Sequence, residues 1–199
     1  DGKTAFVADW LSGLHVIDVS NTASPSLLGT YNTSGQSDGV TISADGKTAF
    51  VADGGSGLQI IDVAESFPNG DASVATSPSI TGTYDTSGSA YDVILSADGN
   101  TAFVADRDSG LQIIDVSNLS SPSLTGTYNT SGAAYSVTLS ADGNTAFVAD
   151  YNHGLDIIDV SNLSSPSLTG TYDTSGISHK EIVGSKRYEQ CSSAFSADK

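Results

Sequence analysis

Basic residues are scarce in this chain of 199 residues, and paired cysteines and long apolar runs are missing from it. Seven Lys and Arg stand against 23 Asp and Glu, which gives a net charge of −16. A surface this acidic repels phosphate backbones and anionic lipids, so we expect no nucleic-acid partner and no membrane insertion. No apolar run approaches the roughly 18 residues that span a bilayer. Cys191 has no second cysteine with which to form an intrachain disulfide.

The few basic residues are unevenly placed. Between residues 1 and 176, 20 acidic residues face only three basic ones, whereas residues 177–199 hold four basic and three acidic residues. The tail therefore differs in composition from the rest. An acidic surface suits cations or a saline medium. Alternatively, Asp is abundant because it forms solvated turns.

Three sequence blocks recur along the chain in a fixed order. The block TAFVAD begins at residues 4, 48, 101 and 145. A block of the form GLxIIDV follows it, with Val in place of the first Ile in the first copy, and begins at residues 13, 57, 110 and 154. The block GTY, followed by Asn or Asp and then TSG, begins at residues 29, 82, 126 and 170. These spacings indicate four copies of a repeat of about 44 residues, the second lengthened by an insertion.

Each repeat predicts four short strands, here called A to D in chain order. In the last complete copy they are YSVTLS (135–140), TAFVAD (145–150), LDIIDV (155–160) and LTGTY (168–172). Val, Ile, Phe, Thr and Tyr fill these runs, and Gly, Asn, Asp, Ser and Pro bound them. Four antiparallel strands in a repeat of this length predict an all-β fold, a β-propeller of four-stranded blades.

The end of the chain returns to the register of its start. The tripeptide SAD precedes each turn between strands A and B, and it occurs again at 196–198. We therefore expect one propeller domain over residues 1–199, with a ring of four blades closed by a C-terminal strand. The expected repeats are 1–36 together with 190–198, then 37–88, 89–132 and 133–176, with 177–189 as an insertion. The alternative is an excerpt of a larger ring, since propellers have about 4 to 8 blades.

The block GLQIIDVSN, preceded by TAFVAD and followed by SP and GTY, resembles the LVIVD repeat, whose motif IIDV matches. The resemblance covers residues 1–176 in all four copies. It implies a propeller fold in a secreted or surface-attached bacterial or archaeal protein, without a well-established activity. The tail from Ile177 departs from the pattern until SAD returns.

Differences between the repeats gather at one predicted end of the ring. Alternating strand direction places the BC turns and the DA loops together, and we call this end the top face. Residues 97–132 and 141–176 differ at five positions, all at the top: Arg107/Tyr151, Asp108/Asn152, Ser109/His153, Gln112/Asp156 and Asn129/Asp173. Near-identical blades that present different side chains on one surface are typical of a recognition face, although drift on a tolerant surface has the same appearance.

The candidate ligand-binding residues on this face are Trp10, Arg107, Asp108, Tyr151 and His153. Aromatic rings offer stacking area to sugars or side chains, and Arg107 and Asp108 offer charged hydrogen bonds. The expected partner is a glycan or a protein.

A calcium site is the one cofactor site that the sequence suggests. Asp106, Asp108 and Gly110 form a D-x-D-x-G run, in which alternate carboxylates can converge on Ca²⁺. Ser117 stands where a calcium loop places its bidentate Glu, so the pattern is incomplete and an Asp-rich turn without metal is the alternative.

Two sets of recurring residues predict structural roles instead. One Asp ends strand C in every copy, where it would cap the following loop: Asp18, Asp62, Asp115 and Asp159. One Tyr ends strand D in every copy, where it would pack against a neighbour: Tyr31, Tyr84, Tyr128 and Tyr172.

Three hypotheses for function follow. The first is a non-catalytic binding or scaffold module at the cell surface or outside the cell, which contacts a glycan or protein through the top face. The second is a metal-dependent hydrolase or lactonase, although the sequence has no H-E-x-x-H, C-x-x-C or complete phosphate-binding loop. The third is a structural subunit of a filament or surface layer. Whether the chain is an enzyme stays open, and so does its oligomeric state.

Overall fold

A computed structural model describes residues 2–64 and 77–174. The described residues form fifteen strands in four antiparallel sheets. Blade 1 contains β1 (Thr4–Ala8), β2 (Leu14–Asp18) and β3 (Ser26–Tyr31). Blade 2 contains β4 (Gly39–Ile42), β5 (Thr48–Ala52), β6 (Leu58–Asp62) and β7 (Ser79–Tyr84). Blade 3 contains β8 (Asp92–Leu95), β9 (Thr101–Ala105), β10 (Leu111–Asp115) and β11 (Ser123–Tyr128). Blade 4 contains β12 (Ala134–Leu139), β13 (Thr145–Asp150), β14 (Gly154–Asp159) and β15 (Ser167–Tyr172).

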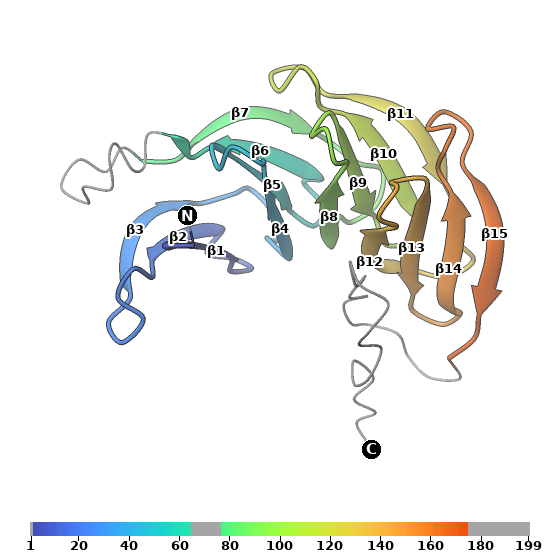
Figure 1. Ribbon diagram of the computed structural model, residues 1–199, viewed down its shortest axis with the longest axis horizontal. Coiled ribbons are helices and arrows are strands. Elements are labelled where there is room, and N and C mark those ends of the chain that lie inside the picture. The colour runs from blue at the N-terminus through green and yellow to red at the C-terminus, as the bar shows by residue number, and fades with distance from the viewer. Residues whose placement is uncertain (1, 65–76, 175–199) are drawn as a thin grey trace.

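In every sheet the strands lie in chain order, each hydrogen-bonded to the next. The four sheets stand side by side along an arc, and β4, β8 and β12 line its inner side (Figure 1). This arrangement confirms the predicted β-propeller of four blades. The predicted closing strand at 190–198 and the insertion at 177–189 lie outside the described residues. Within the described part of the chain, no helix is long and apolar enough to cross a membrane.

The turn between strands A and B is built by its own sequence. In blade 2, Ser43 Oγ donates to Asp45 Oδ1 at 2.7 Å, and the same oxygen accepts from the Lys47 amide at 3.1 Å. Gly46 follows with φ of +74°, a left-handed conformation that favours glycine. These hydrogen bonds, that of Ser43 first, lower the pKa of Asp45. The SADG block is thus a local turn signal.

The Asp at the end of strand C caps the next loop, as the sequence predicts. Each of these carboxylates accepts a hydrogen bond from the amide two residues further on, at 2.8 or 2.9 Å. Hydrogen bonds from Ser20 lower the pKa of Asp18, and Ser117 and Ser161 act in the same way on Asp115 and Asp159. A capping role is therefore confirmed in all four blades.

The core lies between blades. Side chains of one blade pack on those of the next in three clusters, one for each junction. Phe50, Leu58 and Ile60 of blade 2, for example, pack on Val104 and other side chains of blade 3 and are at most 1% exposed. The predicted packing role of the strand D tyrosines is confirmed at Tyr31, Tyr84 and Tyr128. It is wrong at Tyr172, which is 69% exposed because no described blade follows blade 4.

Candidate functional site

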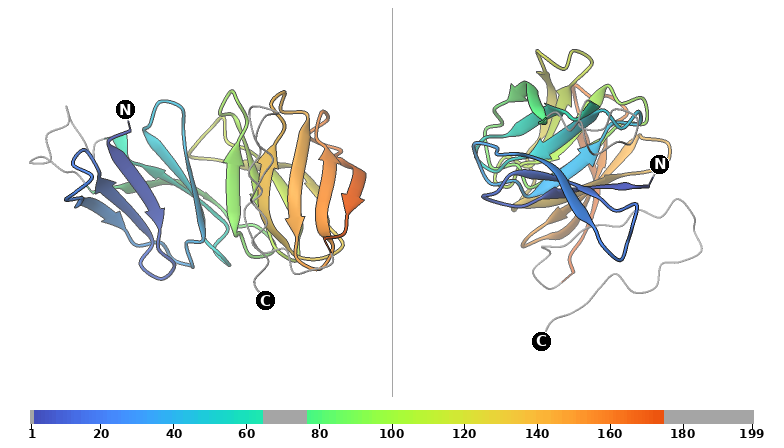
Figure 2. Two further views of the ribbon diagram at one scale, coloured as in Figure 1. Left: turned by 60° about the horizontal axis from the view of Figure 1, so that its bottom comes forward. Right: turned by 90° about the vertical axis from the view of Figure 1, so that its left-hand side faces the viewer.

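The BC turns and DA loops meet at one end of the sheets, as predicted for the top face (Figure 2). In each junction, the BC turn of one blade bridges the loop that leads into the next blade. These antiparallel bridges join Trp10 to Ser37, Gly54 to Ala90 and Arg107 to Ala134. The top face is therefore a hydrogen-bonded surface rather than a set of separate loops.

Trp10 and Arg107 occupy a backbone conformation that disfavours side chains. Both have φ of +43°, and Gly54, with φ of +52°, stands at the same place in blade 2. Bulky residues are rare at positive φ, and such strain persists where the surrounding structure enforces it. Glycine would fit this turn better. The two large side chains therefore point to a role outside folding, and Trp10 is 53% exposed.

Three tyrosines form a row at the top of the inner side. The ring centroids of Tyr91 and Tyr135 are 4.7 Å apart, and those of Tyr135 and Tyr151 are 5.3 Å apart. The rings are tilted by 53° and 32°, within the range of favourable aromatic contacts. Tyr91 precedes β8, Tyr135 lies in β12 and Tyr151 lies in the turn after β13. All three are partly exposed, so the row presents ring surface to solvent.

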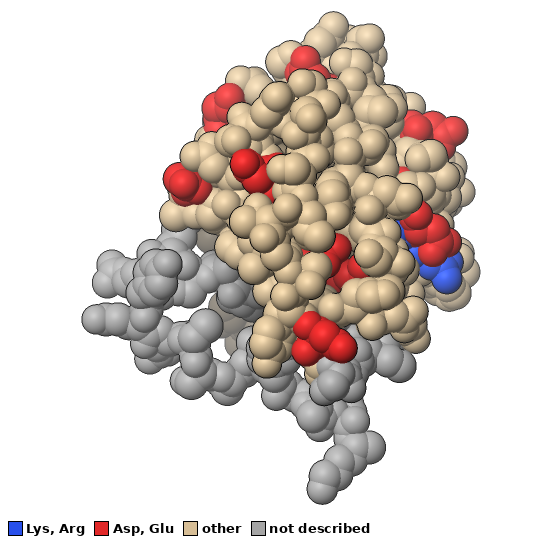
Figure 3. All heavy atoms as spheres, turned by 90° about the vertical axis from the view of Figure 1, so that its right-hand side faces the viewer, with Lys and Arg blue, Asp and Glu red and all other residues tan. Residues whose placement is uncertain are grey.

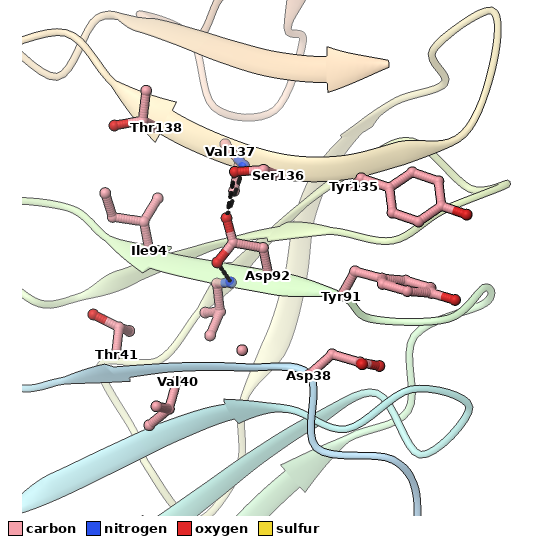
Figure 4. A pocket seen from close by; sticks show the side chains of 12 residues that line it. Asp38, Val40, Thr41, Tyr91, Asp92, Ile94, Tyr135, Ser136, Val137 and Thr138 are labelled. Atoms are coloured by element: carbon pink, nitrogen blue, oxygen red, sulfur yellow. Dashed lines mark hydrogen bonds between the residues drawn. The ribbon is translucent and has the colours of Figure 1, made fainter. Parts of the chain in front are cut away.

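A groove of about 440 Å³ continues from these rings along β4, β8 and β12. Asp38, Tyr91 and Tyr135 occupy one end of it, and their side chains point the same way (Figure 4). Deeper in the groove, Asp92 Oδ2 accepts from Ser136 Oγ at 2.9 Å and from the Val137 amide at 3.0 Å. The charge of Asp92 is thus satisfied between blades 3 and 4.

Charged groups tune the open end of the groove. Partial desolvation raises the pKa of the Asp38 carboxyl, and the negative charge of Asp53 raises it further. Burial raises the pKa of Tyr91, the neighbouring Tyr135 adds to this effect, and the positive charge of Arg107 opposes it. A carboxyl group and a guanidinium therefore both act on the ring of Tyr91. The end of the groove offers ring faces, phenol hydroxyls and one carboxylate acceptor, and the charge of Arg107 acts on it from nearby.

Of the predicted ligand-binding residues, Tyr151 belongs to the tyrosine row and Arg107 acts on it electrostatically. Trp10 lies on the turn that bridges Ser37, the neighbour of Asp38. Asp108 is exposed in the BC turn of blade 3. His153 is half-exposed, with Nδ1 3.5 Å from Asp150 Oδ1. Ligand binding by all five residues stays a prediction.

The proposed calcium ligand Asp106 is fully buried and already hydrogen-bonded. Its Oδ1 accepts from Thr86 Oγ1 at 2.6 Å, and its Oδ2 accepts from the Gly88 amide at 2.9 Å. Asp53 accepts the equivalent hydrogen bonds from Thr33 and Gly35 at the junction between blades 1 and 2. Burial, the largest effect, raises the pKa of Asp106 against these hydrogen bonds. Its carboxylate thus ties a DA loop to strand B.

Among the described residues, no group of three or more His, Cys, Asp and Glu side chains could hold a metal ion. Calcium binding by Asp106 and Asp108 therefore stays a prediction.

Blade 4 keeps only half of this loop tie. Asp150 Oδ2 accepts from the Gly132 amide at 2.8 Å, but Thr130 Oγ1 donates to the Gly132 carbonyl at 3.1 Å, and Asp150 Oδ1 accepts no hydrogen bond. His153 lies beside that oxygen. Burial is the main cause that raises the pKa of Asp156, and the negative charge of Asp150 raises it further. His153 lowers it. Blade 4 therefore brings two carboxyl groups and an imidazole close together.

The sequence comparison missed Asp38, Tyr91 and Tyr135. They occupy one repeat position, three residues after the TSG block, where the first full DA loop has Asp and the next two have Tyr. A signal was present, because this position holds an acidic residue in one copy and an aromatic residue in the next two. The two aligned windows began after this position, and the last two copies share Tyr there, so the difference did not appear.

Solved structures resemble this fold at low sequence identity. A hydrazine synthase from Kuenenia stuttgartiensis matches with a TM-score of 0.64 and 17% identity, over 84% of this chain and 46% of that one. The β-propeller domain of Cps50 (Swd1) from Myceliophteria thermophila matches with 0.66 and 16%, over 87% and 58%. A protein from Lactobacillus plantarum matches with 0.72 and 17%, over 88% and 55%. This chain spans about half the length of these structures, and the likeness shows the propeller fold.

No curated protein matches the chain. A family model described as the LVIVD repeat matches it four times, at residues 1–33, 34–86, 87–130 and 131–174. The boundaries between successive matches lie in the DA loops, so each match contains the strands of one blade. The chain therefore belongs to the LVIVD repeat family and carries four copies of that repeat.

Proposed function

We propose that the chain is a non-catalytic binding module that recognises a glycan at the tyrosine end of the inner groove. The observation that carries this proposal is the row of Tyr91, Tyr135 and Tyr151, with ring centroids 4.7 and 5.3 Å apart. The apolar face of a sugar ring stacks on aromatic rings, and a row of rings suits successive sugars of an oligosaccharide.

The polar groups around the row suit the hydroxyls of a sugar. Asp38 can accept hydrogen bonds, Arg107 can donate them, and the phenol hydroxyls can do both. The net charge of −16 disfavours anionic glycans, so we propose a neutral or amino sugar as ligand. We also propose that the module acts at the cell surface or outside the cell, the location that membership of the family favours.

The test is titration calorimetry of the full chain with cellohexaose, mannohexaose and chitohexaose. Tyr135 lies at the centre of the row, so Tyr135→Ala should remove both ring contacts. An aromatic contact contributes about 0.5 to 1.5 kcal/mol, and we expect the variant to weaken binding roughly five- to tenfold. Tyr135→Phe keeps the ring and should retain most of the affinity.

Leu124→Ala is the control, because Leu124 is 45% exposed on β11, away from the groove-lining strands. It should leave the affinity unchanged. If none of the three oligosaccharides binds, or if Tyr135→Ala binds as well as the parent chain, the proposal is wrong. Specific binding of a protein that Tyr135→Ala abolishes would move the ligand from glycan to protein at the same site.

A further inference from the structure

Each blade has two different faces, and they meet in the same way at every junction. The forward face packs on the blade that follows, and in blade 3 it consists of Phe103, Ala105, Leu111 and Ile113. The backward face packs on the blade before, and in blade 4 it consists of Ala146, Val148, Ile158 and Val160. The equivalent residues form the other two junctions, so one interface is repeated three times.

At the end of the arc the forward face of blade 4 is left uncovered by the described residues. Leu155 and Ile157 are partly exposed, whereas the equivalent residues of blades 2 and 3 are completely buried. Tyr172 is 69% exposed. Figure 3 views the molecule from the side of this blade, and most of the visible surface carries neither basic nor acidic atoms. On this face Leu155, Ile157 and Tyr172 expose apolar surface that is buried at the other junctions, which is typical of an interaction site.

Gly170 lies on this face, and the space beside it is open. A Cβ at Gly82 or Gly126 would lie 2.0 or 2.1 Å from the carbonyl oxygen of Leu119 or Leu163 in the next blade. Those glycines are needed because the CD loop of the following blade packs against them. A Cβ at Gly170 would meet nothing within 4 Å. The position keeps the space for a CD loop that no described residue supplies.

At the other end of the arc the backward face of blade 1 is open in the described part of the chain. Val7 is 40% exposed, but the equivalent Val51, Val104 and Val148 are completely buried, although all four belong to an identical TAFVAD block. The side chain of Asp9 is 58% exposed, where its equivalents Asp53, Asp106 and Asp150 are fully buried. The two open faces are therefore the two halves of the repeated interface.

We propose that a second copy of this chain covers both faces, so that blade 4 of each copy packs on blade 1 of the other. Such a head-to-tail contact closes when two copies complete a ring. The described blades leave the arc open between blade 4 and blade 1 (Figure 1). The chain also aligns with 46 to 58% of the solved structures above, so its curvature suits a ring that contains further blades.

Sedimentation velocity of the full chain over a range of concentrations tests the proposal. We expect a dimer of twice the 20.2 kDa mass of one chain and no larger species, because the ring is closed. Both copies carry a charge of −16, so raising NaCl to about 1 M should strengthen association by screening their repulsion. The proposal is wrong if the chain is a monomer at every concentration, or if it forms an open-ended series of oligomers.

Gly170→Leu fills the open space beside Gly170, where the CD loop of the second copy would pack. It should raise the dissociation constant of the dimer by about tenfold or more, since overpacking a fitted interface is costly. The open space around Gly170 should leave the monomer as stable as before. Val7→Asp tests the opposite face and should have the same effect on the dimer. Leu124→Asp, on an exposed position of β11, is the control and should leave the dimer intact. If Gly170→Leu and Val7→Asp both dimerise like the parent chain, the interface lies elsewhere.

Discussion

The substitution Arg107→Gly should make the protein more stable. Arg107 has φ of +43° in a turn where blade 2 has Gly54 at +52°. The left-handed conformation costs a residue with a side chain about 1 to 2 kcal/mol. Glycine removes that cost but loses about 0.4 to 1 kcal/mol through the greater entropy of the unfolded chain. The net gain is about 0.5 to 1 kcal/mol, or about 1 to 4 °C in melting temperature for a domain of this size.

Urea denaturation and thermal unfolding followed by circular dichroism measure this gain. The matched control is Gly54→Arg, which places the side chain of blade 3 in the same turn of blade 2. It should lower stability by about 1 kcal/mol, because the strain is added and not removed. A Cβ there would also lie 3.3 Å from Gln36 Cβ, which is a close contact.

Arg107→Gly should at the same time weaken glycan binding at the tyrosine row, because the guanidinium near Tyr91 is lost. A variant that is more stable but binds less well would show that the strained residue serves recognition. If Arg107→Gly destabilises the protein as much as Gly54→Arg does, contacts of the Arg107 side chain outweigh the backbone strain. The functional interpretation of the strain would then be refuted.

Three further outcomes are expected. Asp156→Gln should stabilise the protein at pH 7, because burial and the charge of Asp150 raise the folded-state pKa of Asp156. A raised carboxyl pKa means that stability falls as pH rises from the unfolded value of about 4, so the advantage over the parent chain should vanish in urea titrations near pH 4. Asp106→Ala should cost about 2 to 4 kcal/mol, because buried donors lose a charged acceptor, whereas Asp108→Ala, at an exposed site, should change stability by less than about 0.5 kcal/mol. A calcium-induced rise in melting temperature that Asp108→Ala removes would support the calcium site, and an unchanged melting temperature would count against it. Deleting residues 190–199 should destabilise blade 1 of the same chain or of a second copy, because β1 pairs only with β2 in the described chain and has room for one more strand. If hydrogen exchange at β1 and β2 does not change on deletion, residues 190–199 do not supply that strand.

Local chemistry explains how much of this fold the sequence predicts. The SADG block forms its turn through Ser43 and Asp45, and Asp18 caps its loop through an amide two residues away. Such contacts lie within a few residues, so every copy of the repeat repeats them. Blade number, strand order and the top face follow from that repetition.

The tertiary structure decided which copies of identical residues are buried. Val7 and Val51 lie in the same TAFVAD block, yet one is 40% exposed and the other is completely buried. Burial depends on whether another blade covers the face, and the repeat itself contains no information about that neighbour. Tyr172 differs from Tyr128 for the same reason.

The candidate site was also decided by the tertiary structure. Tyr91 and Tyr135 are separated by a whole repeat, and Tyr151 lies one strand hairpin further on. Their rings meet only because β8 and β12 lie side by side on the inner side of the arc. The sequence by itself determined a family, four strand sets and a variable top face. Packing between blades determined which of those variable residues form a groove, because contacts between blades join residues that no local pattern connects.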